Sequence, residues 1–158
     1  MNHFVYAMPQ GRLTIVASET ALTNIYFGVK ELDMPFAPSK ITNDAATQLQ
    51  EYFAKKRTSF DLPIQLKGTP FQLEVWNALR DIPYGQTRTY AQIAETAGRP
   101  NAFRAVGSAN NRNPLPIVVP CHRVVGSDGD LVGYAYGLKL KRFLLELEGV
   151  DVDGLKRR

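Results

Sequence analysis

Hydrophobic positions in the first third of the chain fall in short runs separated by turn residues, which is the pattern of β-strands. Three such runs, rich in Val, Ile, Tyr and Phe, cover residues 4–8, 12–17 and 22–29. The intervening residues 9–11 and 18–20 have the composition of hairpin turns. The pattern therefore predicts an antiparallel sheet, and this part of the chain shows no cluster of catalytic residue types.

A helix and one more strand should complete this first lobe. Asn43 or Asp44 can cap a helix in which apolar residues recur at helical spacing. Residues 60–66 can form a strand, which Pro63 would confine to a sheet edge. We therefore expect residues 1–67 to form a small α+β lobe that supports the rest of the chain.

The second half of the chain is predicted to be mainly helical. Residues 69–72 and 89–92 are Thr-led capping boxes that each open a helix, and Trp76 lies on the apolar face of the first one. The second of these helices ends at the turn 98–100, and another helix follows at about residues 101–110. This succession is typical of a helix-turn-helix.

The end of the chain is predicted to combine a buried strand with one amphipathic helix. Residues 117–119 are a strand-like apolar run, and Asp128-Gly129 favours a hairpin turn. A helix over residues 138–148 should stop at the glycine that follows, and residues 150–158 should be a frayed polar tail. The fold class is therefore α+β, with a small N-terminal antiparallel-sheet lobe followed by a mainly helical domain, residues 68–158, that contains the helix-turn-helix.

Composition excludes several classes of protein. The 158 residues are 44% hydrophobic and 22% charged, as in a folded domain and unlike a disordered chain. No apolar run approaches the roughly 18 residues that span a bilayer, and residues 1–4 do not begin a secretory signal. We expect a cytoplasmic protein, in the cytosol or at the nucleoid.

Positive charge is concentrated in the second half of the chain. Residues 1–84 hold eight Lys or Arg and eight Asp or Glu, whereas residues 85–158 hold eleven against seven and so carry the whole net charge of +4. The basic side chains of residues 85–127 are all arginines: Arg88, Arg99, Arg104, Arg112 and Arg123. Their planar guanidinium groups suit phosphate and base contacts, although a solvated surface would have the same composition.

The single cysteine, Cys121, is the candidate for chemistry. One cysteine forms no internal disulfide, and with only two histidines in the chain we expect no metal site and no cofactor. Cys121 is either a small buried hydrophobe or a reactive thiol whose pKa the following His122 and Arg123 would lower. A direct hydrogen bond between adjacent side chains is not assured, so a water can bridge Cys121 and His122. An acid must then orient the imidazole, and Glu146 and Glu148 are the candidates.

Small residues dominate the second helix of the helix-turn-helix. They are Ala102, Ala105, Gly107, Ser108 and Ala109. Arg104 is the only long side chain that we expect to project from their face. Such a face allows close packing against another helix or close approach to nucleic acid, and the residues alone leave both open.

The residues around Cys121 resemble a known active-site motif. Pro120-Cys121-His122-Arg123-Val124 is similar to that of the O6-alkylguanine-DNA alkyltransferases, also called methylated-DNA–protein-cysteine methyltransferases. Further segments lie at the family's spacing: residues 71–76, 83–85, 104–107, 113–114, 133–134 and 144–149. The resemblance covers about residues 68–149, whereas residues 1–67 are similar to the family's ribonuclease-H-like lobe only in size and strand pattern.

The resemblance implies DNA repair by a protein that acts once. Its cysteine would attack the alkyl carbon on O6 of guanine in duplex DNA, with O4 of thymine as a second candidate, and would remain alkylated. The base would first be flipped out from the minor-groove side. The partner is then double-stranded DNA bearing O6-alkylguanine, bound by a protein that is monomeric in solution, with cooperative loading on DNA left open.

By position in the motif, the resemblance assigns roles to individual residues. The catalytic set is Cys121 as nucleophile, His122 as the water-linked base, Glu148 as the carboxylate that orients it, Tyr90 as proton donor near N3 of the base and Asn113 as the residue that holds the active-site turn. Arg104 would fill the place of the flipped base, and the other DNA contacts would be Ala91, Arg99, Ala102, Ala105, Gly107 and Ser127. The base pocket would be lined by Pro116, Val124, Tyr134 and Ala135, and Tyr136 would narrow it against large alkyl groups.

Three other functions stay open at this point. An alkyltransferase-like protein that only binds damaged DNA would lack the cysteine. A cysteine hydrolase would turn over many substrates, and a transcription regulator would bind DNA sequence-specifically. The stoichiometry of alkyl transfer separates these functions from one another.

Overall fold

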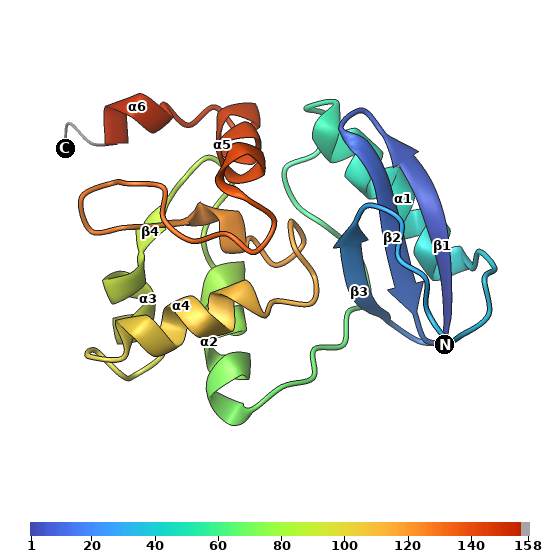
Figure 1. Ribbon diagram of the computed structural model, residues 1–158, viewed down its shortest axis with the longest axis horizontal. Helices are drawn as coiled ribbons and strands as arrows, with labels where there is room; N and C mark the ends of the chain where they lie inside the picture. Colours follow the sequence, from blue (N-terminus) through green and yellow to red (C-terminus); the bar gives the residue numbers. More distant parts are fainter. Residues whose placement is uncertain (156–158) are drawn as a thin grey trace. The chain divides into compact units, whose positions relative to one another are not determined.

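The computed structural model of the protein describes residues 1–155 and divides the chain into two compact units, Met1–Leu66 and Lys67–Arg158 (Figure 1). The first unit combines a sheet with a helix, and the second is mainly helical, so the predicted α+β class is confirmed. No helix among residues 1–155 is long and apolar enough to cross a membrane.

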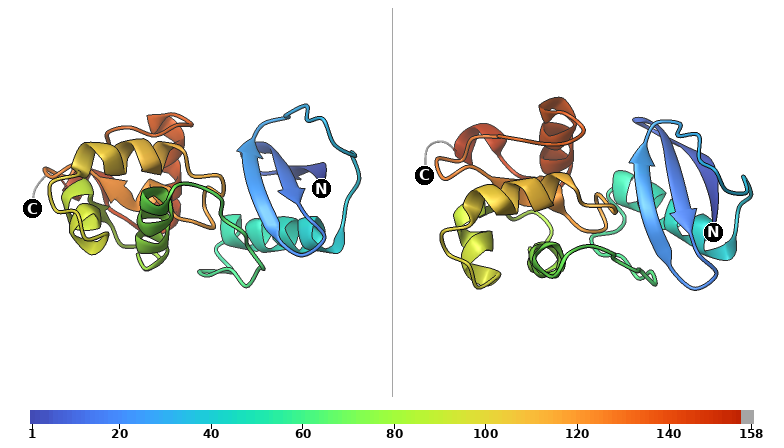
Figure 2. Two further views of the ribbon diagram at one scale, coloured as in Figure 1. Left: turned by 90° about the horizontal axis from the view of Figure 1, so that it is seen from below. Right: turned by 60° about the horizontal axis from the view of Figure 1, so that its bottom comes forward.

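The first unit is a three-stranded antiparallel sheet covered by one helix. Strands β1 (Asn2–Met8), β2 (Gly11–Ala17) and β3 (Leu22–Phe27) lie side by side in the order of the sequence, as the predicted hairpins require. Helix α1 (Lys40–Phe53) contacts all three strands and runs along one face of the sheet (Figure 2). The core of this unit contains apolar side chains from the sheet and the helix: Leu13, Ile15, Leu22, Ile25, Leu49 and Tyr52.

The predicted cap of α1 was wrong. Asn43 and Asp44 lie inside the helix, which begins earlier, at a cap formed by Ser39. The Ser39 hydroxyl accepts a hydrogen bond from Thr42 N at 3.2 Å, and Thr42 Oγ1 accepts one from Ser39 N at 2.8 Å. This is a capping box with Thr in the position where Glu or Gln is the usual signal.

Residues 60–66 do not form the predicted edge strand. Leu22 and Ile64 form one isolated bridge, with hydrogen bonds from Leu22 N to Pro63 O at 2.7 Å and from Gln65 N to Leu22 O at 3.0 Å. Because Pro63 has no N–H with which to continue a ladder, the pairing stays a single bridge.

The second unit consists mainly of helices that pack on one another, with one short parallel pairing of strands. Its elements are α2 (Pro70–Arg80), β4 (Arg88–Thr89), α3 (Tyr90–Thr96), α4 (Phe103–Asn111), the 3-10 turn η1 (Cys121–Arg123), β5 (Val124–Val125), α5 (Leu138–Leu147) and α6 (Val152–Leu155). Thr69 and Thr89 cap α2 and α3 through capping boxes, so both predicted helix starts are confirmed. Trp76 is buried, and its Nε1 donates to Ala109 O at 2.9 Å, which joins α2 to α4.

Two segments after α4 differ from the prediction. Residues 117–119 do not form a strand, since Ile117 has a φ of 74°, outside the range of extended backbone. The strand that does follow, β5, pairs in parallel with β4, so the turn at Asp128-Gly129 does not close a hairpin. An apolar run identifies a buried segment but does not distinguish a strand from a buried loop.

The predicted frayed tail is partly ordered. Helix α6 packs Val152 and Leu155 into a small apolar cluster with Val125 and Leu145. Two apolar residues spaced three apart are therefore enough to order this segment as a helix, although its composition is mainly polar. Residues 156–158 of the predicted tail lie outside the described residues.

Replacing Ser39 with Ala should lower the free energy of unfolding by about 1 kcal/mol, because an N–H at the start of α1 loses its acceptor. Asp44→Ala is the matched control, since an exposed ion pair such as that of Asp44 with Lys40 contributes little to stability. Urea unfolding followed by circular dichroism measures both variants. Equal losses in the two would contradict the Ser39 cap.

Candidate active site

Cys121 begins the turn η1, immediately after Pro120, and only 2% of its surface is exposed. Its N–H donates to Val119 O at 2.8 Å, and its carbonyl accepts from Asn110 Nδ2 at 3.2 Å. Asn110 belongs to α4, so the reactive turn is tied directly to the second helix of the helix-turn-helix.

Asn113 braces the loop that leads to the cysteine. Its Nδ2 donates to Val119 O at 2.7 Å, and its Oδ1 accepts from Leu115 N at 2.9 Å. Both bonds are buried, where a backbone group without a partner would be destabilising. Asn113 thus has the contacts that its predicted role requires, and the role itself stays a prediction.

The thiol of Cys121 is protonated in the resting protein. Burial raises the pKa of Cys121, and the opposing effects of hydrogen bonds with Asn113 and Tyr134 and of the Lys141 charge do not cancel this rise. The expectation of a lowered thiol pKa is therefore wrong for the resting protein. A nucleophilic role for Cys121 would therefore require a base that removes this proton.

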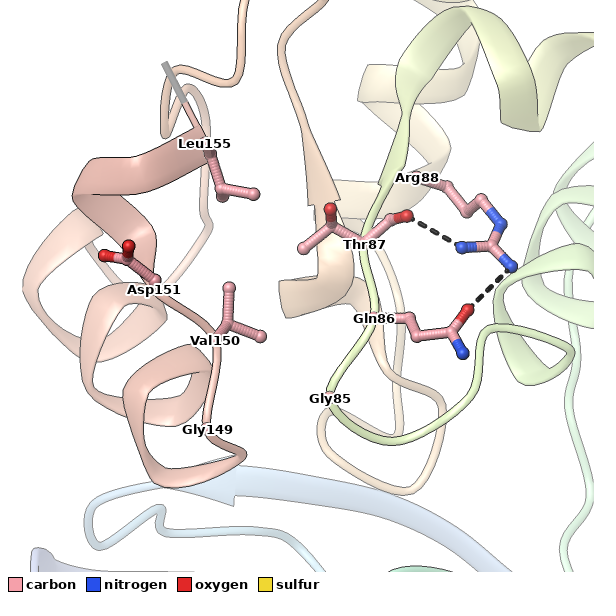
Figure 3. Close-up of a pocket in the computed structure, with 8 residues that line it drawn as sticks. All are labelled: Gly85, Gln86, Thr87, Arg88, Gly149, Val150, Asp151 and Leu155. Atoms are coloured by element: carbon pink, nitrogen blue, oxygen red, sulfur yellow. Dashed lines mark hydrogen bonds between the residues drawn. The ribbon is translucent and has the colours of Figure 1, made fainter. Parts of the chain in front are cut away.

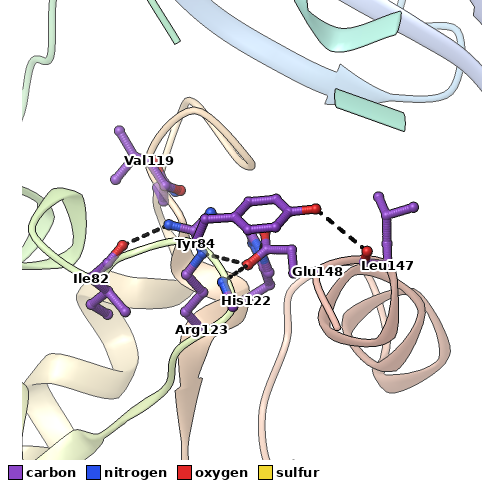
Figure 4. A network of polar contacts seen from close by, with 9 residues as sticks. Ile82, Tyr84, Val119, His122, Arg123, Leu147 and Glu148 are labelled. Carbon is purple, nitrogen blue, oxygen red and sulfur yellow. Dashed lines mark hydrogen bonds and ion pairs between the residues drawn. The ribbon is translucent and has the colours of Figure 1, made fainter. Parts of the chain in front are cut away.

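A buried carboxylate, Glu148, connects two residues of η1. His122 Nε2 lies 2.7 Å from Glu148 Oε2, and Arg123 binds both carboxylate oxygens, at 2.8 Å from Nε and 3.0 Å from Nη2 (Figure 4). Gly85 N donates to Oε1 at 3.1 Å. Burial alone would raise the pKa of Glu148, but the hydrogen bonds and charges of His122 and Arg123 outweigh burial and hold the pKa well below its ordinary value. Glu148 is therefore ionised at neutral pH.

The carboxylate also determines where His122 carries its proton. Burial lowers the pKa of His122 despite the opposing effect of Glu148, so the imidazole is neutral at pH 7. Since a carboxylate only accepts hydrogen bonds, the single N–H of the neutral ring is at Nε2. Nδ1 then carries a lone pair, and it has no hydrogen-bond partner among residues 1–155. His122 thus offers an unoccupied basic nitrogen, as a general base must.

Tyr90 and Lys141 converge on the same pair of carbonyl groups. Tyr90 Oη donates to Val132 O at 2.8 Å, and Lys141 Nζ donates to Val132 O at 3.1 Å and to Gly133 O at 3.3 Å. Burial lowers the pKa of Lys141 to about 8. Burial also raises the pKa of Tyr90 to about 12, so its phenol is protonated at neutral pH.

A shallow pocket of about 250 Å³ opens beside Tyr90. Its lining consists of Tyr90, Phe103, Gly107, Asn111, Val132 and Gly133. The four predicted wall residues do not line this pocket: Pro116, Val124 and Tyr134 are buried, and Ala135 is exposed. Their contact with a base stays a prediction.

The predicted DNA contacts belong to the helix-turn-helix and to one separate loop. Ala91, Arg99, Arg104, Ala105 and Ser127 are exposed, and Ala102 and Gly107 are partly buried. The small residues of α4 are divided between two faces, because Ala109 is buried while Ala105 and Ser108 are exposed. The packing interpretation therefore holds for the buried face of the helix, and close approach of the exposed face to nucleic acid stays a prediction.

A second cavity, of about 460 Å³, lies next to the carboxylate network (Figure 3). It is lined by Gly85, Gln86, Thr87, Arg88, Gly149, Val150, Asp151 and Leu155. The Arg88 guanidinium folds back onto its own segment, donating to Thr87 O at 2.8 Å and to Gln86 Oε1 at 3.1 Å. Among residues 1–155, no group of three or more His, Cys, Asp or Glu is placed to hold a metal ion.

Two family models match the chain and together cover most of it. Residues 70–150 match the DNA binding domain of 6-O-methylguanine DNA methyltransferase, and residues 1–66 match its ribonuclease-like domain. The chain belongs to the 6-O-methylguanine DNA methyltransferase family.

Individual relatives of this methyltransferase agree along nearly the whole chain. The methylated-DNA–protein-cysteine methyltransferase of Methanosarcina barkeri is 48% identical over 153 residues, covering 94% of this chain and 97% of the relative. The constitutive enzyme of Bacillus subtilis is 46% identical over 161 residues, covering 96% and 98%. The crystal structure of Mycobacterium tuberculosis OGT in complex with DNA has a TM-score of 0.87 at 42% identity, covering 98% of this chain and 99% of that one. The protein is therefore a DNA-binding repair enzyme of the methylated-DNA–protein-cysteine S-methyltransferase class.

One of the five arginines between residues 85 and 127 of this methyltransferase has a structural role. Arg123 is buried, and besides its pairing with Glu148 its Nη1 donates to Ile82 O at 2.6 Å. Its guanidinium also lies 5.8 Å from the centre of the Tyr84 ring. The interpretation of Arg123 as a phosphate contact or a solvated side chain is therefore wrong, because all its surroundings are inside the protein.

Lys141 is the main residue of the methyltransferase site that sequence reasoning missed. It is completely buried on α5, where it shares a face with Leu144, Leu145 and Glu148. A lysine in register with the apolar positions of an amphipathic helix was the available signal. Such a lysine either reaches past the core to water or, as here, donates to backbone carbonyl groups of another segment.

Replacing Glu148 with Gln should destabilise the methyltransferase at pH 7 by about 3–5 kcal/mol, because Arg123 would keep a buried charge without its counter-ion. The pKa of Glu148 is lower in the folded than in the unfolded protein. The stabilisation is therefore complete above about pH 5 and is lost as the pH falls further.

The difference in free energy of unfolding between wild type and Glu148→Gln should accordingly shrink from pH 7 to about pH 3.5. Urea unfolding at the two pH values measures it, with Glu146→Gln as the control at an exposed neighbour that pairs with Arg142. A pH-independent difference would show that the charge of Glu148 is not the stabilising feature.

Proposed function

We propose that the protein takes a methyl or larger alkyl group from O6 of guanine in duplex DNA and keeps it as a thioether on Cys121. One observation carries this proposal. The buried thiol lies in the same turn as His122, which has a free basic Nδ1 and is held at Nε2 by the ionised Glu148. The second candidate substrate atom, O4 of thymine, would react by the same displacement.

The transfer begins with removal of the thiol proton. Since the pKa of Cys121 is raised, His122 Nδ1 takes this proton, through a bridging water, as the sulfur attacks. The S–C bond forms, the C–O6 bond breaks, and the bonding electron pair leaves on the guanine. The thioether has no route back to the thiol, so each protein molecule acts once.

Tyr90 supplies a proton to the leaving guanine near N3. In the resting protein this proton is engaged with Val132 O, so Tyr90 has to exchange one acceptor for another. Lys141 donates to the same carbonyl and to Gly133 O, and it can hold the segment in place while Tyr90 turns to the base. The positive charge of Lys141 also favours the thiolate as it forms.

DNA binding places the flipped nucleotide at this site. The domain of residues 68–158 approaches the minor groove with α4, Arg104 fills the place that the base leaves, and residues 1–67 support this domain. Small side chains enter the narrow groove and read little sequence, so binding should be sensitive to salt and nearly independent of sequence. We expect a monomer in solution.

The binding-only alternative is the second candidate, and Cys121 argues against it. A protein that only marks damage needs the nucleotide pocket and the DNA contacts but has no use for a thiol beside a general base. The cysteine hydrolase needs repeated turnover, and the regulator needs sequence-specific binding. Neither requirement follows from the described geometry.

Incubation with an excess of duplex DNA containing one O6-methylguanine should add one methyl group to the intact protein. The gain should saturate at one per molecule and map to Cys121, as measured by mass spectrometry of the whole protein and its peptides. Cys121→Ser should keep damage-selective binding and gain no mass. Damage-selective binding by the wild type without a mass gain would support the binding-only alternative instead.

Arg104→Ala should slow methyl transfer from duplex DNA about tenfold or more, because flipping a base costs a few kcal/mol and Arg104 offsets part of this cost. Transfer from the free base O6-methylguanine should not change, since no stack has to be opened. Arg112→Ala, at the exposed C-terminal end of α4, is the control. Equal slowing of both substrates by Arg104→Ala would remove the stack-filling role.

A further inference from the structure

Phe103 is a second long side chain on the exposed surface of α4. It is the first residue of the helix, next to Arg104, and 50% of its surface is exposed. The expectation that Arg104 alone would project from this surface is therefore wrong. A single exposed apolar side chain is ordinary on a protein, so the significance of Phe103 depends on its neighbours.

These neighbours form the pocket beside Tyr90. Phe103 and Gly107 are four residues apart on α4, so they lie on one face of the helix and line the pocket together. Val132, itself 45% exposed, lies in the same lining and provides a second apolar side chain. The pocket therefore has two apolar side chains and the ring of Tyr90 in its walls.

Glycines keep this pocket open. A Cβ at Gly107 would stand 3.9 Å from Tyr90 Cε1, and a Cβ at Gly133 would stand 3.6 Å from Tyr90 Oη. Side chains at these two positions would fill space next to the phenol. The volume of about 250 Å³ is suited to a single flat ring system such as a nucleobase.

Phe103 lies between the proposed stack-filling residue and this pocket. Successive residues of a helix are rotated by about 100° around its axis, so Arg104 points away from the direction of Phe103. The exposed side chain of Arg104 would enter the duplex, whereas the side chain of Phe103 lines the pocket together with Tyr90. A nucleotide that moves from the stack toward the pocket passes the ring of Phe103.

We propose that Phe103 is a stacking platform for the extruded nucleotide. The ring covers one face of the alkylated base after it leaves the duplex, while Tyr90 and Val132 border the rest of the pocket. Every base presents a π-face, so such stacking works without sequence preference. This inference rests on the proposed function, to which it adds a substrate-contacting residue.

The alternative is an apolar wedge between base pairs, as some minor-groove proteins insert. Arg104 occupies the centre of the exposed face of α4, opposite the buried Val106 and Ala109, and is therefore better placed to enter the stack. The two roles differ in substrate dependence. A wedge matters only in duplex DNA, whereas a platform also matters for a single strand.

The test compares Phe103→Ala, Phe103→Leu and Phe103→Tyr with the wild type. The rate constant of methyl transfer is measured with one oligonucleotide that contains a single O6-methylguanine, as a single strand and as a duplex. Phe103→Ala should slow transfer from both forms about tenfold, within the range that loss of one base–aromatic stack produces. Phe103→Tyr should keep the wild-type rate, and Phe103→Leu should recover less of the rate than Tyr does.

Phe143→Ala is the matched control. Phe143 is 37% exposed on α5 and lies outside the pocket lining, so its removal should leave both rate constants unchanged. Melting temperatures establish that each variant is folded. If Phe103→Ala does not fold, the comparison of Phe103→Leu with Phe103→Tyr carries the test.

Three results would overturn the platform. They are an unchanged rate in Phe103→Ala, a loss confined to the duplex, and equal rates for Phe103→Leu and Phe103→Tyr. The duplex-only loss would identify a wedge, and equal Leu and Tyr rates would identify an apolar cover without stacking. Failure of the proposed function is distinguishable, since the wild type would then gain no methyl group in the same assay.

Discussion

The second unit depends on one buried negative charge. Glu148, at the end of α5, is bound by His122 and Arg123 of η1 and by the N–H of Gly85, which lies far from both in the sequence. A buried carboxylate is tolerated only when donors satisfy its oxygens. Here the donors come from two segments and the carboxylate from a third, so these three segments have to meet. The bonds that compensate the buried charge also fix the tautomer of His122, and stability and chemistry share the same atoms.

Burial of the thiol has two opposite effects on a protein that acts once. A protonated, buried Cys121 is a poor target for oxidants and small electrophiles, because the thiolate is the reactive form. The same burial keeps the thiol protonated in the resting protein, so the proposed reaction requires a base close to the sulfur. In the proposed reaction this base is His122, whose other nitrogen is occupied by Glu148. Reactivity is thereby confined to encounters in which the substrate carbon is already positioned.

Local signals in the sequence predicted local structure well. The Thr69 and Thr89 capping boxes placed the starts of α2 and α3 correctly, since a cap involves residues only three apart. The cap of α1 was missed because Thr42 replaces the acidic or amide side chain that usually marks such a box. The strand predicted at residues 117–119 failed for a different reason. An apolar run predicts that a segment is buried, but it does not predict the backbone conformation. The positive φ of Ile117 shows that this segment is a loop.

The site was harder to predict where it depends on contacts between distant segments. The sequence shows Cys121, His122 and Arg123 in succession, but it does not show which residues their side chains contact. Arg123 turns inward because Glu148 lies 25 residues further along the chain and close in space. Lys141 was overlooked for the same reason, since the carbonyl groups that accept its hydrogen bonds belong to an irregular segment. The exposure of Phe103 was not predicted either, because it depends on how α4 packs against the rest of the unit.

The helix-turn-helix of this protein is not a detachable module. Its first helix, α3, follows directly from β4, and β4 pairs with β5, the strand that comes after the turn η1 in the sequence. Its second helix, α4, is bound by the indole of Trp76, which donates a hydrogen bond to Ala109 O. A segment cut to residues 89–112 would contain neither partner. Exchange of these two helices between relatives would therefore have to include α2 and β5. The two regions are thereby constrained to change together.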